Sequence, residues 1–315
     1  MTALNHLLAA TDLSVPSLYA VDRGFLLAKE LGARYTVMHA LAIDSPEEFR
    51  LLLREEVPEV WRRMEETAVE ALTQVINDPS RNAGVSAAIH VEKGLPVSTV
   101  PASAQSLRAG LVLLGAHGGG FLQNLLLGST TSNLLRNSEC PVLVVKRPAD
   151  RAYRRVLIPV DFSPASEIAI RVAQQIAPEA HLVLLHIYDV PFEGKMLYAG
   201  VDDQLIERYR KDAREHAYIQ LGNLARSVGL SLANYTGIVL HSNPAREILD
   251  EEIKHGHDLI VMGKHGTHLT EELLLGSLTK RVLAESHCDV LVVLDKRTPD
   301  LTMPLPDHAK AEPPP

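Results

Sequence analysis

The chain has 315 residues, of which 46% are hydrophobic, 22% charged and 4% aromatic, and its formal net charge is −8. This length and composition are typical of a globular protein of two domains, whereas the acidic balance and the few aromatic side chains argue against nucleic acid as a partner, because nucleic acid requires a basic face or a stacking platform. Neither an uncharged apolar stretch of about 18 residues nor an N-terminal signal segment is evident, so we expect a cytoplasmic protein without a membrane span.

Short apolar runs alternate with helical patterns through the first half of the chain. Strands are predicted at residues 6–10, 36–41, 85–91, 111–114 and 142–145, and helices at residues 16–31, 45–76, 96–107 and 129–137. The first helix should end at Gly32 and the second should begin at Ser45-Pro46, because these residue types are common at helix ends. Strands that are short and apolar on both faces indicate a parallel sheet covered by helices on both sides.

From Arg155 the same alternation starts again. Strands are predicted at residues 156–160, 182–187, 232–240, 259–262 and 290–294, and helices at residues 165–176 and 200–227, from Pro244, and after Gly276. The sequence therefore predicts an α/β protein of two tandem doubly wound domains, residues 1–148 and 153–297, each with a five-stranded parallel sheet. Residues 298–315 are rich in proline and lack a periodic pattern, so we interpret them as a mobile tail.

One glycine motif occurs twice, 148 residues apart. Gly115-Ala116-His117-Gly118 is followed after nine residues by Gly128-Ser129, and Gly263-Lys264-His265-Gly266 is followed at the same spacing by Gly276-Ser277. Each copy comes after an apolar strand and leads into a helix. Each half also has one cysteine in a matching position, Cys140 or Cys288, which we interpret as a packing residue and not as half of a disulfide.

The glycine motif has the features of a phosphate site. Ligands of open parallel sheets bind beyond the carboxyl ends of the strands, where glycine lets the backbone approach a ligand closely. The helices that begin at Ser129 and Ser277 would direct their free N–H groups and positive dipole ends to this crevice. The hydroxyl groups of Thr131 and Thr279 would add hydrogen-bond donors. The motif thus predicts an anion site in each half.

An aspartate follows the first strand of each half, at Asp12 and Asp161. Both would reach the crevice and accept hydrogen bonds from ribose hydroxyls, although an aspartate in this place serves as a helix cap about as often. The motifs GxxxxGK[ST] and GxGxxG are both absent. Their absence argues against ordinary phosphate-loop hydrolysis and against dinucleotide redox chemistry.

Taken together, these features resemble the universal stress protein family in its tandem two-domain form. The resemblance rests on the two glycine motifs, on Asp12 and Asp161, and on Cys-Pro-Val-Leu-Val-Val and Cys-Asp-Val-Leu-Val-Val near the ends of the two halves. It implies the strand order 3-2-1-4-5 in each half, pairing of the halves through their fifth strands, and a homodimer that uses other surfaces. It also implies binding of ATP, or of ADP or AMP, with Mg²⁺ or Mn²⁺ on the phosphates, and contact of adenine with the backbone near Ala40 and Ile187.

We therefore predict two nucleotide sites at the carboxyl ends of the strands. The predicted residues are Asp12, Ala40, Gly115, His117, Gly118, Gly128, Ser129, Thr130 and Thr131 in the first half, and Asp161, Ile187, Gly263, His265, Gly266, Gly276, Ser277, Leu278 and Thr279 in the second. The motif histidines either contact phosphate or point to solvent. The implied function is that of an ATP-binding stress-response protein that acts as a nucleotide-dependent regulatory switch, or as an adaptor for a regulatory protein partner.

The chain departs from the family pattern at three places. The aspartate usual before the fourth strand is Gly110 in the first half and is kept as Asp258 in the second. The glycine usual before the third helix is kept as Gly94 in the first half and is replaced by Ser242 in the second. The arginine common after the glycine motif is replaced by Gly119 in the first half and by Thr267 in the second. Both glycine motifs remain intact, but the departures leave open whether both sites bind nucleotide.

Other functions have less support in the sequence. The densest histidine cluster, His255-Gly256-His257-Asp258, lacks a second ligand pair at zinc-finger spacing, so we predict no metal site formed by the protein's own residues. His39 and His186 end matching strands, and we interpret them as core or rim residues. No Ser/His/Asp or Cys/His arrangement indicates a catalytic centre. A slow ATP hydrolase, or a structural protein that binds no nucleotide, remains the alternative.

Overall fold

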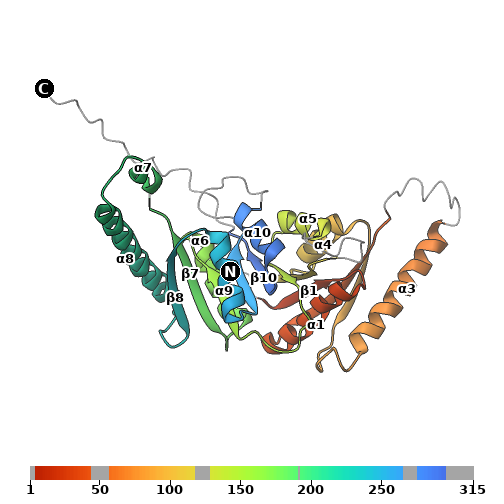
Figure 1. Ribbon diagram of the computed structural model, residues 1–315. Coiled ribbons are helices and arrows are strands. Elements are labelled where there is room, and N and C mark those ends of the chain that lie inside the picture. The colour runs from red at the N-terminus through yellow and green to blue at the C-terminus, as the bar shows by residue number, and fades with distance from the viewer. Residues whose placement is uncertain (1–3, 44–56, 118–127, 191, 265–274, 296–315) are drawn as a thin grey trace.

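A single ten-stranded sheet runs through the computed structural model, with helices on both of its faces (Figure 1). The structure describes residues 4–43, 57–117, 128–190, 192–264 and 275–295. Within these ranges the strand order is β3-β2-β1-β4-β5-β10-β9-β6-β7-β8. Each half therefore has the predicted order 3-2-1-4-5, and the two halves meet at their fifth strands.

The first half builds one end of this sheet. Its strands are β1 (His6–Ala10), β2 (Arg34–Leu41), β3 (Ala88–Lys93), β4 (Leu111–Gly115) and β5 (Val142–Val145), and its described helices are α1 (Val15–Leu31), α3 (Val57–Asn77), α4 (Pro96–Ser106) and α5 (Ser129–Asn137). The prediction that β3 begins at Val85 was wrong, because the backbone N–H of Val85 closes a turn onto Asn82 O at 2.8 Å. The helix start predicted at Ser45 lies outside the described residues.

The second half repeats the arrangement. Its strands are β6 (Arg155–Pro159), β7 (His181–Tyr188), β8 (Tyr235–His241), β9 (Leu259–Gly263) and β10 (Asp289–Val293), and its described helices are α6 (Pro164–Ile176), α7 (Glu193–Tyr198), α8 (Asp203–Ser227), α9 (Pro244–His255) and α10 (Ser277–Glu285). β8 begins three residues after the predicted Leu232, because Asn234 N–H bonds to Ser231 O at 2.9 Å in a turn. The short helix α7 was not predicted.

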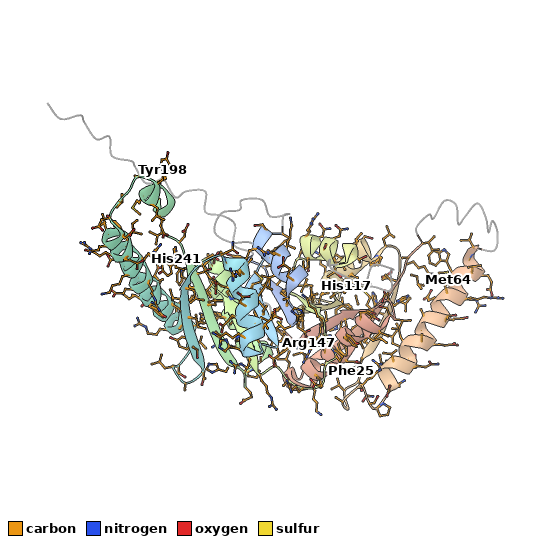
Figure 2. All side chains as sticks on the ribbon, viewed as in Figure 1. Phe25, Met64, His117, Arg147, Tyr198 and His241 are labelled. Carbon is orange, nitrogen blue, oxygen red and sulfur yellow. The ribbon has the colours of Figure 1, made fainter. Side chains whose placement is uncertain are left out.

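Apolar side chains fill the space between the sheet and the helices on both faces. Helices α1, α3, α6 and α8 cover one face, and α4, α5, α9 and α10 cover the other. Successive strand residues point to opposite faces, so Leu7 of β1 packs in one layer and Leu8 in the other. Phe25 of α1 is completely buried in one of these layers, whereas Tyr198 on α7 is 95% exposed; both residues are labelled in Figure 2. Each fully buried large apolar side chain contributes about 1.5–3 kcal/mol.

The helices at the two ends of the sheet are long and polar. In Figure 1, α3 and α8 lie at opposite ends of the molecule, each packed against the sheet by a few buried side chains such as Leu72 and Leu221. Across the described ranges, every helix is too short or too polar to span a lipid bilayer. Cys140 and Cys288 are both buried and neither forms a disulfide, which confirms that they are packing residues.

The seam between the halves is an antiparallel pair of strands. Val144 of β5 pairs with Val290 of β10, and Val142 pairs with Val292. This pairing confirms the expectation that the fifth strands meet, and it removes two apolar sheet edges that would otherwise be exposed.

A buried polar cluster reinforces the seam. The carboxylate of Asp289, which is 1% exposed, accepts hydrogen bonds from the Tyr153 hydroxyl at 2.6 Å and from the backbone N–H of Lys146 at 2.8 Å. Arg23 of α1 lies 3.3 Å from the same carboxylate and 4.1 Å from the centroid of the Tyr153 ring. Helix α1, the end of β5 and the segment between the halves are thereby fastened to β10.

Two lysines cross the seam to helix ends on the other side. Lys146 Nζ donates to Leu283 O at 2.8 Å and to Ser286 O at 2.6 Å, at the C-terminus of α10. Lys264 Nζ donates to Arg136 O at 2.6 Å, in the last turn of α5. A cation at a helix C-terminus satisfies unpaired carbonyls and favours the dipole, so each half stabilises a helix of the other.

We expect Asp289→Ala to lower the free energy of unfolding by about 3–5 kcal/mol, because the buried charge of Arg23 would lose its counterion. Chemical denaturation followed by circular dichroism measures this loss. Asp150→Ala, at an exposed position between the halves, is the control and should change the value by less than about 0.5 kcal/mol. Equal effects of the two substitutions would show that the cluster does not hold the seam.

Burial lowers the pKa of Lys146 to about 8, from its ordinary value of 10.5. Between these two pH values the folded chain binds fewer protons than the unfolded chain, so this group should raise stability as pH rises, by roughly 3 kcal/mol in total. The free energy of unfolding of the wild type minus that of Lys146→Met should therefore increase from pH 8 to 10.5 and stay constant below pH 7. A difference that is flat across the whole range would contradict the shifted pKa.

Candidate functional site

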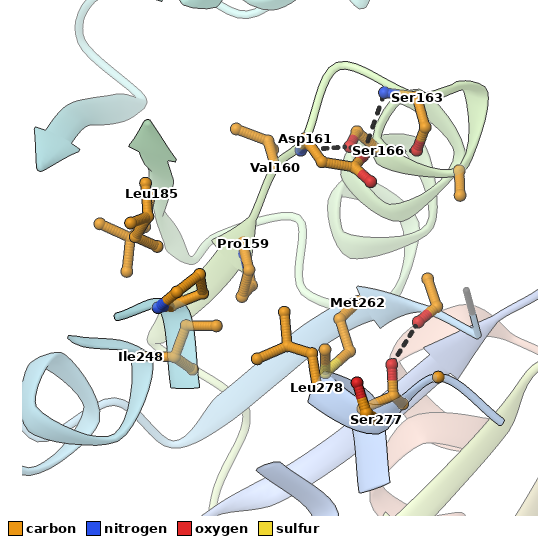
Figure 3. Close-up of a pocket in the computed structure, with 16 residues that line it drawn as sticks. Pro159, Val160, Asp161, Ser163, Ser166, Leu185, Ile248, Met262, Ser277 and Leu278 are labelled. Carbon is orange, nitrogen blue, oxygen red and sulfur yellow. Dashed lines mark hydrogen bonds between the residues drawn. The ribbon is translucent and has the colours of Figure 1, made fainter. Parts of the chain in front are cut away.

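A pocket of about 400 Å³ opens at the carboxyl ends of β6, β7 and β9 in the second half (Figure 3). Its floor is apolar, and its rim carries hydroxyl groups and a carboxylate. It is lined by Pro159, Val160, Asp161, Ser163, Ala165, Ser166, Leu185, Ile187, Pro244, Ile248, Met262, Gly263, Gly276, Ser277, Leu278 and Thr279. The pocket thus lies beside the point where the strand order reverses between β6 and β9, the usual ligand position in this architecture.

Three helices begin at this pocket. α6 contributes Ser163 and Ser166, α9 contributes Pro244, and α10 contributes Ser277 and Thr279. Within the described residues, no side chain caps the start of α6 or α10. The first N–H groups of a helix have no intrahelical acceptor, and they add to the positive end of the helix dipole. The start of α9 is capped by the Asn243 side chain, which accepts the Arg246 N–H, so the uncapped N-termini that make the pocket favourable for an anion are those of α6 and α10.

The turn after β6 holds the pocket's carboxylate. Asp161 Oδ1 accepts hydrogen bonds from the backbone N–H of Ser163 at 3.0 Å and from the Ser166 hydroxyl at 2.8 Å. Phe162, which lies between Asp161 and Ser163 in the chain, has a φ of 61°, a left-handed conformation that is unusual for a bulky residue. The hydrogen bonds of Asp161 hold this conformation, and strain of this kind is concentrated at functional sites.

The first half has the same turn after β1. Asp12 Oδ1 accepts the backbone N–H of Ser14 at 3.0 Å, and Leu13 has a φ of 66°. Such a bond from an aspartate to the N–H two residues later is an Asx turn. Both aspartates therefore shape the turn from which each helix begins.

A histidine lies near the carboxyl end of the second strand in each half. His186 Nδ1 lies 2.8 Å from Val160 O, and its ring packs on Phe162 with the centroids 4.2 Å apart. Burial lowers the pKa of His186, so the ring is neutral near pH 7 and donates from Nδ1. In the first half, His39 Nδ1 lies 2.8 Å from Thr11 O. Both rings tie the second strand of their half to the end of the first.

The two ends of each glycine loop are joined by matching bonds. Gly128 N–H donates to Ala116 O at 3.1 Å, and Gly276 N–H donates to Lys264 O at 3.0 Å. One turn further along the helix, Thr131 Oγ1 donates to Gly115 O at 3.1 Å. The two halves thus share one loop geometry at its base.

The threonines of this turn bond to the backbone at the base of the loop. Thr279 Oγ1 donates to Gly263 O at 3.0 Å, as Thr131 does to Gly115. A hydroxyl has a single hydrogen to donate, and here it goes to the backbone carbonyl. Thr131 and Thr279 thus position the loop in this structure, and their contact with phosphate stays a prediction.

Seven of the predicted second-half residues line the pocket: Asp161, Ile187, Gly263, Gly276, Ser277, Leu278 and Thr279. Gly118, His265 and Gly266 lie outside the described residues. In the first half, Asp12, Ala40, Gly115, His117, Gly128, Ser129, Thr130 and Thr131 lie at or next to the carboxyl ends of β1, β2 and β4 or the start of α5. His117 is half-buried there and is labelled in Figure 2.

Sequence reasoning missed the apolar floor and two hydroxyl groups. Leu185, Ile248 and Met262 belong to apolar runs that are indistinguishable in sequence from core residues. Ser163 and Ser166 follow Asp161 at the start of a helix, a pattern that could have indicated their bonds to the aspartate.

The structure shows where one departure from the family pattern lies, Gly110 in the first half, together with its counterpart Asp258 in the second. Gly110 N–H bonds to His6 O at 2.8 Å, and the Asp258 carboxylate accepts the backbone N–H of Arg154 at 2.9 Å, both at the amino ends of the strands. This departure is therefore at the edge opposite the pocket and does not bear on ligand binding. Gly119 and Thr267 lie outside the described residues.

The sequence model of the universal stress protein family matches the chain twice, over residues 4–146 and 152–293. The chain belongs to the universal stress protein family. It is 35% identical over 150 residues to universal stress protein MJ0531 of Methanocaldococcus jannaschii, which covers 47% of this chain and 85% of that protein. It is 26% identical over 242 residues to universal stress protein Rv2005c of Mycobacterium tuberculosis, covering 75% of this chain and 80% of the relative.

A solved universal stress protein has the same fold over most of the chain. The crystal structure of a universal stress protein from Archaeoglobus fulgidus superposes with a TM-score of 0.66 at 20% identity, covering 92% of this chain and 98% of that one. The tandem arrangement of two universal stress protein domains is therefore not peculiar to this chain.

The two glycines of the first loop should respond differently to substitution. A Cβ at Gly115 would lie 2.8 Å from Pro16 O, so the start of α1 would have to move, whereas a Cβ at Gly128 would have Ala116 O as its nearest neighbour at 3.4 Å. We expect Gly115→Ala to lower the free energy of unfolding by about 1–3 kcal/mol and Gly128→Ala to change it by less than about 1 kcal/mol. Urea denaturation measures both, and equal losses would contradict the close approach at Gly115.

Proposed function

We propose that this protein binds an adenine nucleotide in the pocket of its second half and acts in the stress response as a nucleotide-dependent switch or adaptor. The observation that supports this most directly is the convergence of the N-termini of α6 and α10 on a pocket with an apolar floor. An adenine nucleotide has the matching parts, a flat apolar base and a chain of phosphates. Membership of the universal stress protein family supports the same proposal.

Each part of the nucleotide has a corresponding wall of the pocket. Adenine would lie on the floor near Leu185 and Ile187, where the strands end. Ribose would lie next to Asp161, which stays on the rim through its bonds to Ser163 and Ser166. The phosphates would meet the free N–H groups at the start of α10, beside Ser277. Mg²⁺ or Mn²⁺ would neutralise the phosphate oxygens. Asp161 is the carboxylate of the pocket lining that such an ion could approach.

The first half is a second candidate site, because its turn and its loop base repeat those of the second half. We propose the second half as the primary site, since the pocket found there is complete enough to seat a ligand. A ligand in this pocket would also affect the other half of the molecule. Gly263 lines the pocket, and the adjacent Lys264 bonds to α5 across the seam.

We propose binding, and not turnover, as the function of this site. A hydrolase needs a base that is free to orient water. Asp161 Oδ1 already accepts bonds from the N–H and hydroxyl of Ser163 and from the Ser166 hydroxyl, which suits an anchoring role. A homodimer would have to form through surfaces other than the fifth strands, because these are paired within the chain.

Calorimetric titration of the full chain with ATP, ADP and AMP tests the proposal. We expect binding, and a rise in melting temperature that grows with ligand concentration. Ser277→Glu should weaken binding at least tenfold, because its carboxylate would repel the phosphates. Ser129→Glu makes the same change at the equivalent place in α5 and reports on the first half.

Ser231→Glu is the matched control, since it adds the same charge at an exposed position before β8, at the opposite edge of the sheet. It should leave nucleotide affinity unchanged. If millimolar nucleotide neither binds nor raises the melting temperature of the wild type, the proposed function is wrong. Phosphate release is measured in the same samples. If neither Ser277→Glu nor Ser129→Glu alters the rate of phosphate release, hydrolysis at these two helix starts is excluded.

A further inference from the structure

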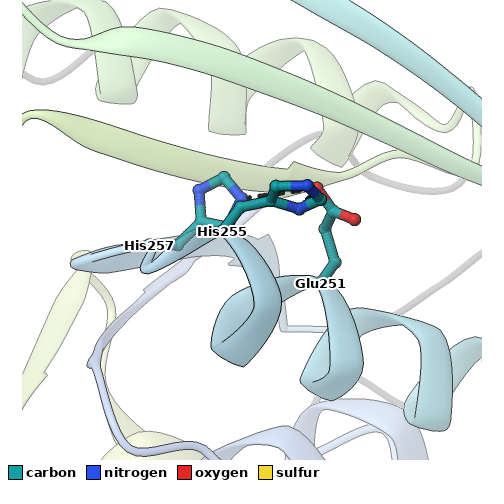
Figure 4. Close-up of side chains that lie close together, drawn as sticks. All are labelled: Glu251, His255 and His257. Carbon is teal, nitrogen blue, oxygen red and sulfur yellow. Dashed lines mark ion pairs between the residues drawn. The ribbon is translucent and has the colours of Figure 1, made fainter.

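Three potential metal ligands meet at the C-terminus of α9, far along the helix from the pocket. Figure 4 shows Glu251, His255 and His257 with their side chains turned toward one another. Their ligand atoms all lie within 4.8 Å of one another. The pocket is reached by the first residue of this helix, Pro244, and α9 spans roughly 18 Å from end to end. The cluster is therefore separate from the proposed nucleotide site.

The chain brings these three residues together by two local devices. Glu251 and His255 are four residues apart on one helix face, and Glu251 Oε1 lies 2.7 Å from His255 Nδ1. Gly256 then ends the helix in the left-handed conformation, with a φ of 62°. This turn reverses the chain, so that His257 Nε2 lies 3.6 Å from the same carboxylate oxygen.

His257 is the feature that indicates a ligand. Its side chain is 0% exposed, and neither ring nitrogen has a hydrogen-bond partner. Buried polar groups are nearly always hydrogen-bonded, and leaving one unsatisfied costs about 1–3 kcal/mol. Because Nε2 is directed at Glu251 without bonding to it, an atom placed between them would satisfy the ring.

The spacing of the ligand atoms suits one small cation. Zinc binds imidazole nitrogen and carboxylate oxygen at about 2.0–2.2 Å, so ligand atoms of a tetrahedral ion are roughly 3.3 Å apart. The measured separations of 2.7 and 3.6 Å lie on either side of this value. The last carbonyls of α9 add the negative end of its dipole, which favours a cation. His255 is 37% exposed, so an ion has access from solvent.

We propose that Glu251, His255 and His257 form a Zn²⁺ site, with two imidazoles and one carboxylate as protein ligands and a water in the fourth position. This donor set is of the kind that binds zinc. The ion would replace the bond between Glu251 and His255 and would supply the missing partner of His257. The proposal does not depend on nucleotide binding.

A second group in the described residues, Asp189, Glu193 and His241, has similar spacing. Its central carboxylate is already engaged, because Arg210 donates two hydrogen bonds to Glu193 Oε1 and His241 Nε2 lies 2.9 Å from Glu193 Oε2. Among these three residues no histidine is completely buried without a partner, as His257 is. This group therefore serves as the internal comparison in the test.

The sequence prediction of no metal site considered zinc-finger spacing and the neighbour Asp258. The structure directs Asp258 away, to the backbone N–H groups of Arg154 and Arg155. The third ligand is instead Glu251, one helical turn before His255, which only the helix and its glycine turn bring into place.

Zinc titration of the untagged full-length protein, after treatment with EDTA and its removal, tests the site in competition with a chromophoric chelator. We expect one tightly bound Zn²⁺ per chain. Glu251→Gln and His255→Gln should each weaken it by more than about tenfold, since even partners outside the coordination sphere affect metal affinity 10–100-fold. Zinc should also raise the melting temperature of the wild type and not that of these variants.

Two control variants separate this site from the background. His216→Gln removes an exposed histidine of α8, and His241→Gln disrupts the second group; both should leave the affinity within twofold of the wild type. Cobalt provides an independent readout, because visible absorption bands of bound Co²⁺ should appear in the wild type and vanish in Glu251→Gln.

Glu251→Gln retains side-chain size and His255 is partly exposed, so circular dichroism should show both variants folded; if one is not, the other decides. Absence of stoichiometric zinc binding by the wild type would overturn the proposal. Loss of affinity in His241→Gln but not in His255→Gln would overturn it equally. Nucleotide titration of His255→Gln should match the wild type, so failure of the zinc site and failure of the proposed function are distinguishable.

Discussion

The antiparallel pairing of β5 with β10 is the constraint on which the rest of the molecule depends. Each half alone would end in a strand of valine and leucine with unpaired backbone at a sheet edge. Pairing the two strands joins the halves into one ten-stranded sheet. The buried Asp289, held by Arg23 and Tyr153, then fastens α1 and the linker to the seam. The relative position of the two crevices follows from this pairing.

The seam also brings the second glycine loop and the end of β5 into contact with the opposite half. Lys264 belongs to the second motif, yet its ammonium group bonds to the C-terminal turn of α5. Lys146, directly after β5, bonds to the end of α10 in the same way. Because Gly263 lines the pocket and the adjacent Lys264 is bonded to a helix of the other half, a change in this loop has a short physical route across the molecule. The switch proposed above would use this route.

The candidate site was predictable at positions where the backbone geometry requires a particular residue type. Gly115 is required because a Cβ there would collide with the start of α1, and the aspartates after β1 and β6 are recognisable as turn formers. The backbone bonds of Thr131 and Thr279 were not predictable, because a hydroxyl at a helix start bonds equally well to a ligand or to a nearby carbonyl. They depend on the position of Gly115 O and Gly263 O relative to the helix.

The sequence by itself determined the alternation of strands and helices, the duplication, the family and the edge of the sheet at which a ligand would bind, because periodicity and glycine spacing are local properties of the chain. Tertiary structure alone decided three things: that Arg23 and Tyr153 meet the buried Asp289 at the seam, that Leu185, Ile248 and Met262 form a pocket floor, and that Glu251 faces His255 and His257. Each of these depends on residues that are distant in sequence, or on the direction of side chains at a helix end, and such distances are set by packing of the whole chain.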